Sequence, residues 1–143
     1  MKKFGGPVAP ADHVRAVMRW GLAAFFVTAG VTHFTAPQAL LSITPAWVPF
    51  VPQVIFATGL FEFAASAALV TRRWRAYAGV ALAVYAVCVW PANFKHAFEA
   101  VDIPPIPSSW WYHAPRLAVQ PFIVWWALFA SDVIDWPMRW NWR

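Results

Sequence analysis

A long stretch without charge is the feature that most limits what this chain can fold into. No Asp, Glu, Lys or Arg occurs from Trp20 to Phe61. One membrane crossing takes about 20 residues, since the hydrocarbon core is about 30 Å thick. The stretch is too long for one crossing, and it is interrupted by Pro37, Pro45, Pro49 and Pro52. We therefore predict two spans, over residues 14–34 and 50–71, with a loop between them.

Two more apolar segments follow, over residues 76–93 and 115–133. Proline is favoured at the first position of a helix, so we expect the last span to begin near Pro115, while Pro137 discourages helix beyond it. Composition supports a lipid environment, because 61% of the residues are hydrophobic and only 12% are charged, against about 25% charged in soluble domains. The predicted fold is an all-α, integral membrane four-helix bundle forming a single domain over residues 1–143.

The distribution of Lys and Arg predicts the orientation of this bundle. Basic residues concentrate in cytoplasmic connections of membrane proteins. With both termini and the turn after residue 71 in the cytoplasm, the inner side holds Lys2, Lys3, Arg15, Arg19, Arg72, Arg73, Arg75, Arg139 and Arg143. The outer side holds Lys95 and Arg116. The segment from Phe4 to His13 contains Gly, Pro and Asp, which argues against a cleavable signal peptide.

The two predicted outer loops, residues 35–52 and 95–114, are rich in proline and aromatic residues. Irregular backbone cannot enter the hydrocarbon exposed to lipid, because its N–H and C=O groups would go unpaired. We expect both loops to cap the bilayer surface. The net charge of +5 would suggest nucleic acid for a soluble domain. We predict no nucleic-acid partner here, because the basic residues lie between apolar segments.

Glu62 is the only acidic residue in the middle of a predicted span, since Asp132 lies at the very end of the fourth. It follows Pro52 by ten residues, about 15 Å along a helix, which places it near the bilayer centre. A central acid facing lipid costs about 3 kcal/mol, so we expect Glu62 to face the bundle interior, either protonated or paired. Two readings stay open: a structural polar contact between helices, or a ligand or proton site in which Glu62 is the candidate catalytic proton acceptor.

Polar residues on the other three spans are candidate partners of Glu62. His33 ends the first span and Asn93 ends the third, while Arg116 and Gln120 lie one turn apart on the fourth, so they share a helix face. We predict that these five residues line one ligand-binding pocket in the outer half of the membrane. Arg116 is expected to extend its guanidinium inward toward the acid.

Proline and glycine add to this picture of the spans. Pro91 and Pro121 each remove a helical hydrogen bond, so we expect kinks and freed carbonyl groups in the outer half. The alternative is that these kinks serve packing alone. Gly59 and Gly79 are expected to let helices approach closely.

Cysteine and histidine limit the chemistry. Cys88 is the single cysteine, so no intramolecular disulfide or CxxC pair is possible, and we expect it to be a buried packing residue. His96 and His113 flank the second outer loop. Their spacing and that of His33 match no short metal-ligand motif. We expect no metal or haem, and histidines that are solvated or hydrogen-bonded.

The sequence resembles the DoxX-like family of small four-span membrane proteins over residues 17–126. The resemblance depends on motifs in the expected order: Ala29-Gly30…His33-Phe34, Gly59…Glu62, Pro91-Ala92-Asn93, and Arg116…Gln120 with Trp125-Trp126. It implies a bacterial inner-membrane protein linked to thiol, sulfur or quinone-connected redox systems. The chain departs from redox-active relatives in lacking a cysteine pair.

Three functional hypotheses remain. The first is an outward-facing polar pocket that binds a small or lipophilic redox-linked ligand, with a quinone as the candidate cofactor. The second is a non-catalytic accessory subunit or assembly factor of a larger membrane redox complex. The third, ranked lowest, is a proton-coupled exporter, because the chain has one intramembrane acid and no internal repeat. Whether the chain catalyses a reaction stays open.

Overall fold

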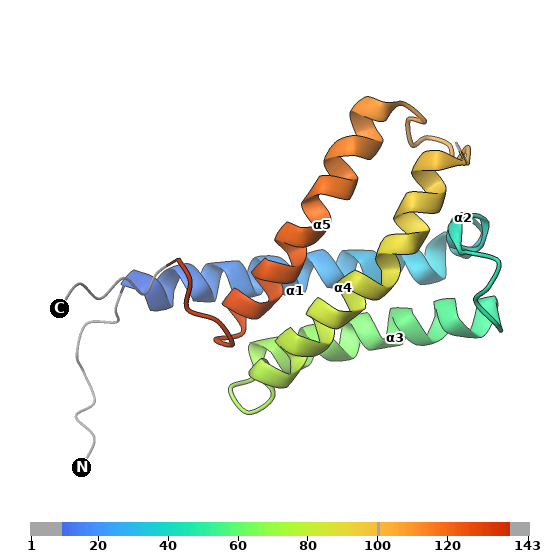
Figure 1. The fold of residues 1–143 in the computed structure, drawn as a ribbon. Coiled ribbons are helices and arrows are strands. Elements are labelled where there is room, and N and C mark those ends of the chain that lie inside the picture. The colour runs from blue at the N-terminus through green and yellow to red at the C-terminus, as the bar shows by residue number, and fades with distance from the viewer. Residues whose placement is uncertain (1–9, 100, 138–143) are drawn as a thin grey trace, which may run out of the picture.

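The computed structural model describes residues 10–99 and 101–137, and these residues form five helices and no named strand. The helices are α1 (Pro10–Thr35), α2 (Pro37–Ile43), α3 (Val51–Val70), α4 (Arg75–Phe98) and α5 (Trp110–Ala130), shown in Figure 1. The prediction of an all-α chain is confirmed. The predicted charges at Lys2, Lys3, Arg139 and Arg143, and the segment before residue 10, lie outside the described residues.

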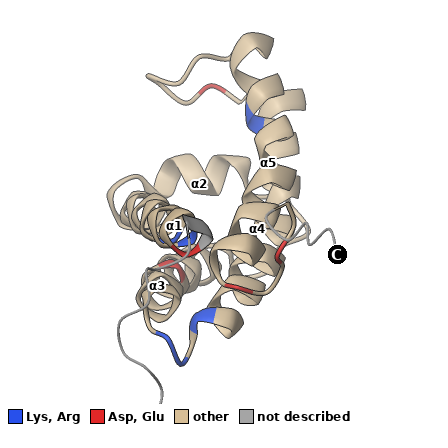
Figure 2. Ribbon diagram, turned by 90° about the vertical axis from the view of Figure 1, so that its left-hand side faces the viewer, with Lys and Arg blue, Asp and Glu red and all other residues tan. Residues whose placement is uncertain are grey.

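The helices form two pairs. α1 packs mainly on α3, and α4 packs mainly on α5; Figures 1 and 2 show the two pairs side by side. They converge where α1 begins and α5 ends, and they spread apart toward α2. We call the converging side the charged end, for the ion pairs given below, and the spreading side the open end.

Small side chains allow the helices to approach closely, as the sequence predicts. A Cβ atom added to Gly59 of α3 would lie 2.7 Å from Cβ of His33 in α1. A Cβ atom added to Gly79 of α4 would lie 2.8 Å from the Ala127 carbonyl oxygen of α5. Toward the charged end the core is apolar and fully buried at Leu22, Leu69, Leu82, Ala127 and Ala130.

Ion pairs join the helices at the charged end. Asp132, just after α5, lies 2.9 Å from Nη1 of Arg15, 3.2 Å from Nη2 of Arg19 and 2.8 Å from Nη1 of Arg75. Asp135 lies 2.7 Å from Arg15. Partial burial raises the pKa of Asp132, but hydrogen bonds from Arg75 and Arg15 and the charge of Arg19 outweigh it, so the pKa falls below its ordinary value of 3.8. This cluster fixes α1, α4 and the segment after α5 to one another.

Within residues 10–99 and 101–137, three helical segments are long and apolar enough to cross a membrane: Asp12–Thr35, Val51–Val70 and Arg75–Phe98. Large apolar side chains on all three are exposed, including Val17, Phe56 and Val84, as expected for surfaces that face lipid. These helices indicate a membrane protein. α5, where we predict a fourth crossing, has 21 residues but is not among the three, because its prolines, tryptophans and polar residues lower its hydropathy.

The helix ends differ from the prediction at the second outer loop. α4 continues through Lys95 to Phe98, and α5 begins at Trp110. Pro115 therefore lies inside α5. The sequence predicts it at the start of the helix. The rings of Phe98 and Trp110 pack edge to face at 5.4 Å, and this contact stabilises both extended ends. In the first outer loop, residues 37–43 form the short helix α2.

Candidate functional site

A cavity of about 680 Å³ lies between the two helix pairs toward the open end. Its wall includes residues of all five helices and of the segment after α2. Every residue predicted for the pocket lines it: His33, Glu62, Asn93, Arg116 and Gln120. The rest of the wall is mainly apolar, and the volume is in the range of pockets that hold one drug-sized ligand, about 300–1,000 Å³.

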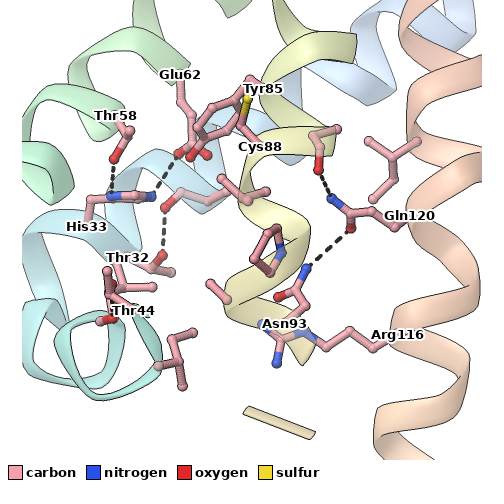
Figure 3. A pocket seen from close by; sticks show the side chains of 18 of the residues that line it. Thr32, His33, Thr44, Thr58, Glu62, Tyr85, Cys88, Asn93, Arg116 and Gln120 are labelled. Atoms are coloured by element: carbon pink, nitrogen blue, oxygen red, sulfur yellow. Dashed lines mark hydrogen bonds and ion pairs between the residues drawn. The ribbon is translucent and has the colours of Figure 1, made fainter. Parts of the chain in front are cut away.

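Glu62 lies on the α3 wall and faces the interior, as predicted, with 3% of its surface exposed. Its Oε2 atom lies 3.4 Å from Nε2 of His33 in α1. This contact is at ion-pair distance, yet Oε2 has no hydrogen-bond partner within the described part of the chain. Tyr85 of α4 lies beside the same carboxyl group in Figure 3. The polar neighbours of this buried carboxyl group are therefore His33 and Tyr85.

The other ring nitrogen of His33 fixes its tautomer. Nδ1 lies 2.8 Å from the Ile55 carbonyl oxygen, which can only accept a hydrogen bond. It also lies 3.1 Å from Oγ1 of Thr58. The Thr58 hydroxyl lies 2.8 Å from the Val54 carbonyl oxygen and donates its hydrogen there, so Oγ1 accepts at Nδ1. Nδ1 therefore carries a hydrogen, and Nε2 of the neutral ring has only a lone pair.

This tautomer determines the charge of the Glu62–His33 pair. A lone pair on Nε2 facing an ionised carboxylate would be repulsive at a site shielded from water. One further proton removes the repulsion, whether it resides on Nε2 or on the carboxyl group. In both forms the pair has a net charge of zero, which is the least costly state at membrane depth. We conclude that the pair holds one proton in addition to the hydrogen on Nδ1 of His33, so the carboxylate is not ionised beside a neutral imidazole.

Two amide side chains lie on the opposite wall. Gln120 of α5 is 5% exposed, and its Nε2 donates a hydrogen bond to the Ala86 carbonyl oxygen of α4. Asn93 of α4 donates from Nδ2 to Oε1 of Gln120 at 3.4 Å. Figure 3 shows both amides facing the cavity across from Glu62. They also connect α4 to α5 on either side of Pro91, a proline inside α4, because Asn93 follows it by two residues and Ala86 precedes it by five.

Arg116 does not reach Glu62, and the prediction that it extends toward the acid is wrong. Its Nη1 lies 2.6 Å from Nδ1 of His96, and Figure 3 places it near Asn93, across the cavity from Glu62. The reason is the extra length of α4, which brings His96 within reach of the guanidinium. The ionisable partner of Glu62 is His33 instead.

Three further residues of the site were not predicted as such. Thr58, Tyr85 and Cys88 line the cavity. Cys88 is exposed, so the expectation of a buried packing residue is wrong. The signal was present in the sequence, because Tyr85, Cys88 and Ala92 recur at spacings of three and four and so share the α4 face that carries the cavity wall.

His96 and His113 are buried, with 1% and 2% of their surfaces exposed, and their rings meet edge to face at 4.8 Å. The expectation of solvated or hydrogen-bonded histidines fails for His113, since neither of its ring nitrogens has a hydrogen-bond partner in the described segments. No group of three or more His, Cys, Asp or Glu residues able to hold a metal ion occurs within residues 10–99 and 101–137.

Residues 22–131 match the sequence profile of a family described as "Domain of unknown function (DUF8561)". The chain belongs to this family. The DUF8561 match begins within α1 and ends just after α5, so it covers the cavity and all of its lining residues. No curated protein and no solved structure matches the chain. The DUF8561 match does not test the resemblance to the DoxX-like family, which stays a prediction.

Proposed function

We propose that this DUF8561 protein is a binding protein of the bacterial inner membrane whose cavity takes one small lipophilic ligand of redox-linked chemistry, such as a quinone. The observation that carries the proposal is the cavity itself. Its walls are mainly apolar, and its polar groups are a proton-holding pair on one side and two amides with Arg116 on the other. Apolar pockets with a few convergent polar groups are typical of small-molecule sites.

In this proposal the two walls have different roles. Asn93, Gln120 and Arg116 orient an oxygen atom of the ligand, because each carries N–H donors. Glu62 exchanges a proton with the ligand through its carboxyl group, and His33, whose Nε2 lies 3.4 Å from Oε2, supplies or takes up the proton that the pair shares. A quinone ring has carbonyl oxygens at opposite edges, which suits polar groups on opposite walls.

The proposed topology has four crossings, with α5 as the fourth and the open end outward. α5 packs along α4 and carries exposed apolar residues such as Val119 and Phe122, which support its insertion beside the three apolar helices. Arg15, Arg19 and Arg75 gather at the charged end. Their position supports a cytoplasmic charged end under the positive-inside rule.

The test uses Cys88 as a reporter, because it is the only cysteine of the chain and lines the cavity. A short-chain ubiquinone analogue bound in the cavity is expected to slow the reaction of Cys88 with a small maleimide in nanodiscs. Glu62→Gln is expected to weaken this protection. Glu99→Gln, which alters an exposed acid after α4, is the matched control and should leave it unchanged. If the quinone analogue protects Cys88 equally well in Glu62→Gln and in wild type, Glu62 has no proton-exchange role in binding.

The second candidate function is an accessory subunit of a membrane redox complex. It is favoured by large aromatic side chains at the open end, where Trp47 is 72% and Trp111 is 92% exposed. Tryptophan at a membrane interface is also expected without any partner, so this candidate ranks second. Mild extraction followed by native gel electrophoresis distinguishes the two: migration as a single small species argues against a subunit role.

A further inference from the structure

The cavity has an uncompensated positive charge at Arg116. Its charged and titratable lining residues are His33, Glu62, Tyr85, Cys88, Tyr112 and Arg116. The Glu62–His33 pair is neutral with its shared proton, and Tyr85, Tyr112 and Cys88 in their protonated forms add no charge. Within the described residues no carboxylate lies at ion-pair distance from Arg116. The net charge of the lining is therefore +1.

The surroundings of Arg116 orient its charge and do not cancel it. Nδ1 of His96 accepts a hydrogen bond from Nη1 at 2.6 Å, so His96 is a neutral acceptor with its hydrogen on Nε2. The Tyr112 ring lies 5.9 Å from the guanidinium carbon, at the outer limit of a cation–π contact. Glu99 and Asp102 in the following loop are exposed. One guanidinium nitrogen is held by His96, and Arg116 remains on the cavity wall.

A half-buried guanidinium is costly unless an anion accompanies it. Arginine binds oxyanions through two parallel N–H donors, and this geometry suits carboxylate and phosphate groups. Asn93 lies beside Arg116 in Figure 3 and adds an amide on the same wall. The remaining wall is mainly apolar, and the volume of about 680 Å³ suits one hydrocarbon chain better than a two-chain phospholipid.

We propose that the ligand is a single-chain amphiphile whose oxyanion headgroup, a carboxylate or a phosphate monoester, binds Arg116. This inference rests on the proposed function, since it assumes that the cavity binds a lipophilic ligand. It narrows the ligand class, because a neutral quinone of the same chain length is then the weaker ligand. Arg116 acts as the residue that selects an anionic head over a neutral one.

The test compares ligands that have the same hydrocarbon chain length and differ in the headgroup. Palmitate, methyl palmitate and hexadecyl phosphate are added to the protein in nanodiscs of zwitterionic lipid, at alkaline pH where the acid is ionised. Protection of Cys88 from a small maleimide measures binding. We expect wild type to bind the charged ligands about tenfold or more tightly than the ester, as for one charge-assisted hydrogen-bond pair. A difference between palmitate and hexadecyl phosphate separates a fatty acid from a lipid phosphate as the preferred source.

Variants assign the preference to Arg116. Arg116→Gln should abolish the preference for charged ligands and leave ester binding in place, while Arg116→Lys keeps the charge and should retain part of it. Arg72→Gln makes the same charge change at an exposed residue of the α3–α4 turn and should behave as wild type. If Arg116→Gln does not fold, the graded loss in Arg116→Lys carries the test.

The outcomes separate this inference from the proposed function. Equal binding of ester and acid by wild type overturns the anionic headgroup and leaves the binding cavity in place. A preference that persists in Arg116→Gln overturns the role of Arg116. Protection by none of these ligands and none by the quinone analogue overturns both the inference and the proposed function.

Discussion

Replacing Gly59 by alanine is expected to separate α1 from α3 and to disturb the Glu62–His33 pair. The new Cβ atom would lie 2.7 Å from Cβ of His33 and 2.8 Å from Cε2 of Phe34. Carbon atoms in contact normally lie about 3.5–4.0 Å apart. Cβ of His33 is fixed by the backbone, so relief of the clash requires the two helices to move apart locally by about 1 Å.

The energetic cost follows from two opposing effects. Overpacking a well-packed contact costs about 1–3 kcal/mol, whereas alanine in place of a helical glycine gains about 1 kcal/mol. The expected net loss is about 0–2 kcal/mol, toward the upper end because Cβ of His33 cannot move without the backbone, and this corresponds to a fall in Tm of up to several degrees for a chain of this size. Separation of the helices also lengthens the 3.4 Å contact of His33 with Glu62, so ligand protection of Cys88 should weaken.

Gly21→Ala is the matched control, because it makes the same chemical change in α1. Its added Cβ atom would meet only the end of the Trp126 side chain, at 3.3 Å, which can yield more easily. We expect the Tm of this variant to equal or exceed that of wild type when both are unfolded in the same detergent. If Gly59→Ala and Gly21→Ala shift Tm equally, the close α1–α3 contact does not limit stability, and the reasoning is refuted.

Three more predictions concern the ends of the molecule. Gly79→Ala should lower Tm more than Gly59→Ala, because its Cβ atom would overlap Ser131 and approach a backbone carbonyl; thermal unfolding measures this, and an unchanged Tm contradicts it. The pKa of Asp132 is lowered in the folded protein, so its ionised carboxylate stabilises the fold above the ordinary pKa of 3.8. This stabilisation is lost as the pH falls through the lower folded-state pKa. The Tm difference between wild type and Asp132→Asn should therefore shrink over that acidic range, and a constant difference would be evidence against this role of Asp132. With Cys88 replaced by alanine, an impermeant maleimide should label Ser108→Cys and not Arg73→Cys in spheroplasts; the reverse pattern inverts the proposed topology.

The depth of each polar residue in the bilayer could be predicted from its position along a helix. Similar depths indicated that the site residues lie together. His33 and Asn93 come at the ends of apolar runs, and Glu62 comes at the middle of one. Counting residues gives their level in the bilayer, because each adds 1.5 Å along a helix. In the structure His33, Glu62, Asn93, Arg116 and Gln120 share one cavity.

Rotation about each helix axis and the true helix ends could not be predicted in the same way. Whether Glu62 contacts His33 or Arg116 depends on the angle at which the two helix pairs cross. The residue pattern within one helix contains no information on that angle. The extension of α4 to Phe98 depends on a ring contact with Trp110, which is distant in sequence. The pairing of Arg15 with Asp132 spans 117 positions, and Asp132 lies beyond the last helix, where periodicity gives no information.

The division of the molecule into a charged end and an open end bears on what fills the cavity. The cavity is open to its surroundings, since its lining residues Trp47 and Trp111 are 72% and 92% exposed. Water, lipid or a ligand from the membrane can therefore enter it. Water satisfies Glu62 and Arg116 but gains little along the apolar walls. A ligand with a polar head and a hydrocarbon chain satisfies both, so the helix arrangement itself favours an occupant drawn from the membrane.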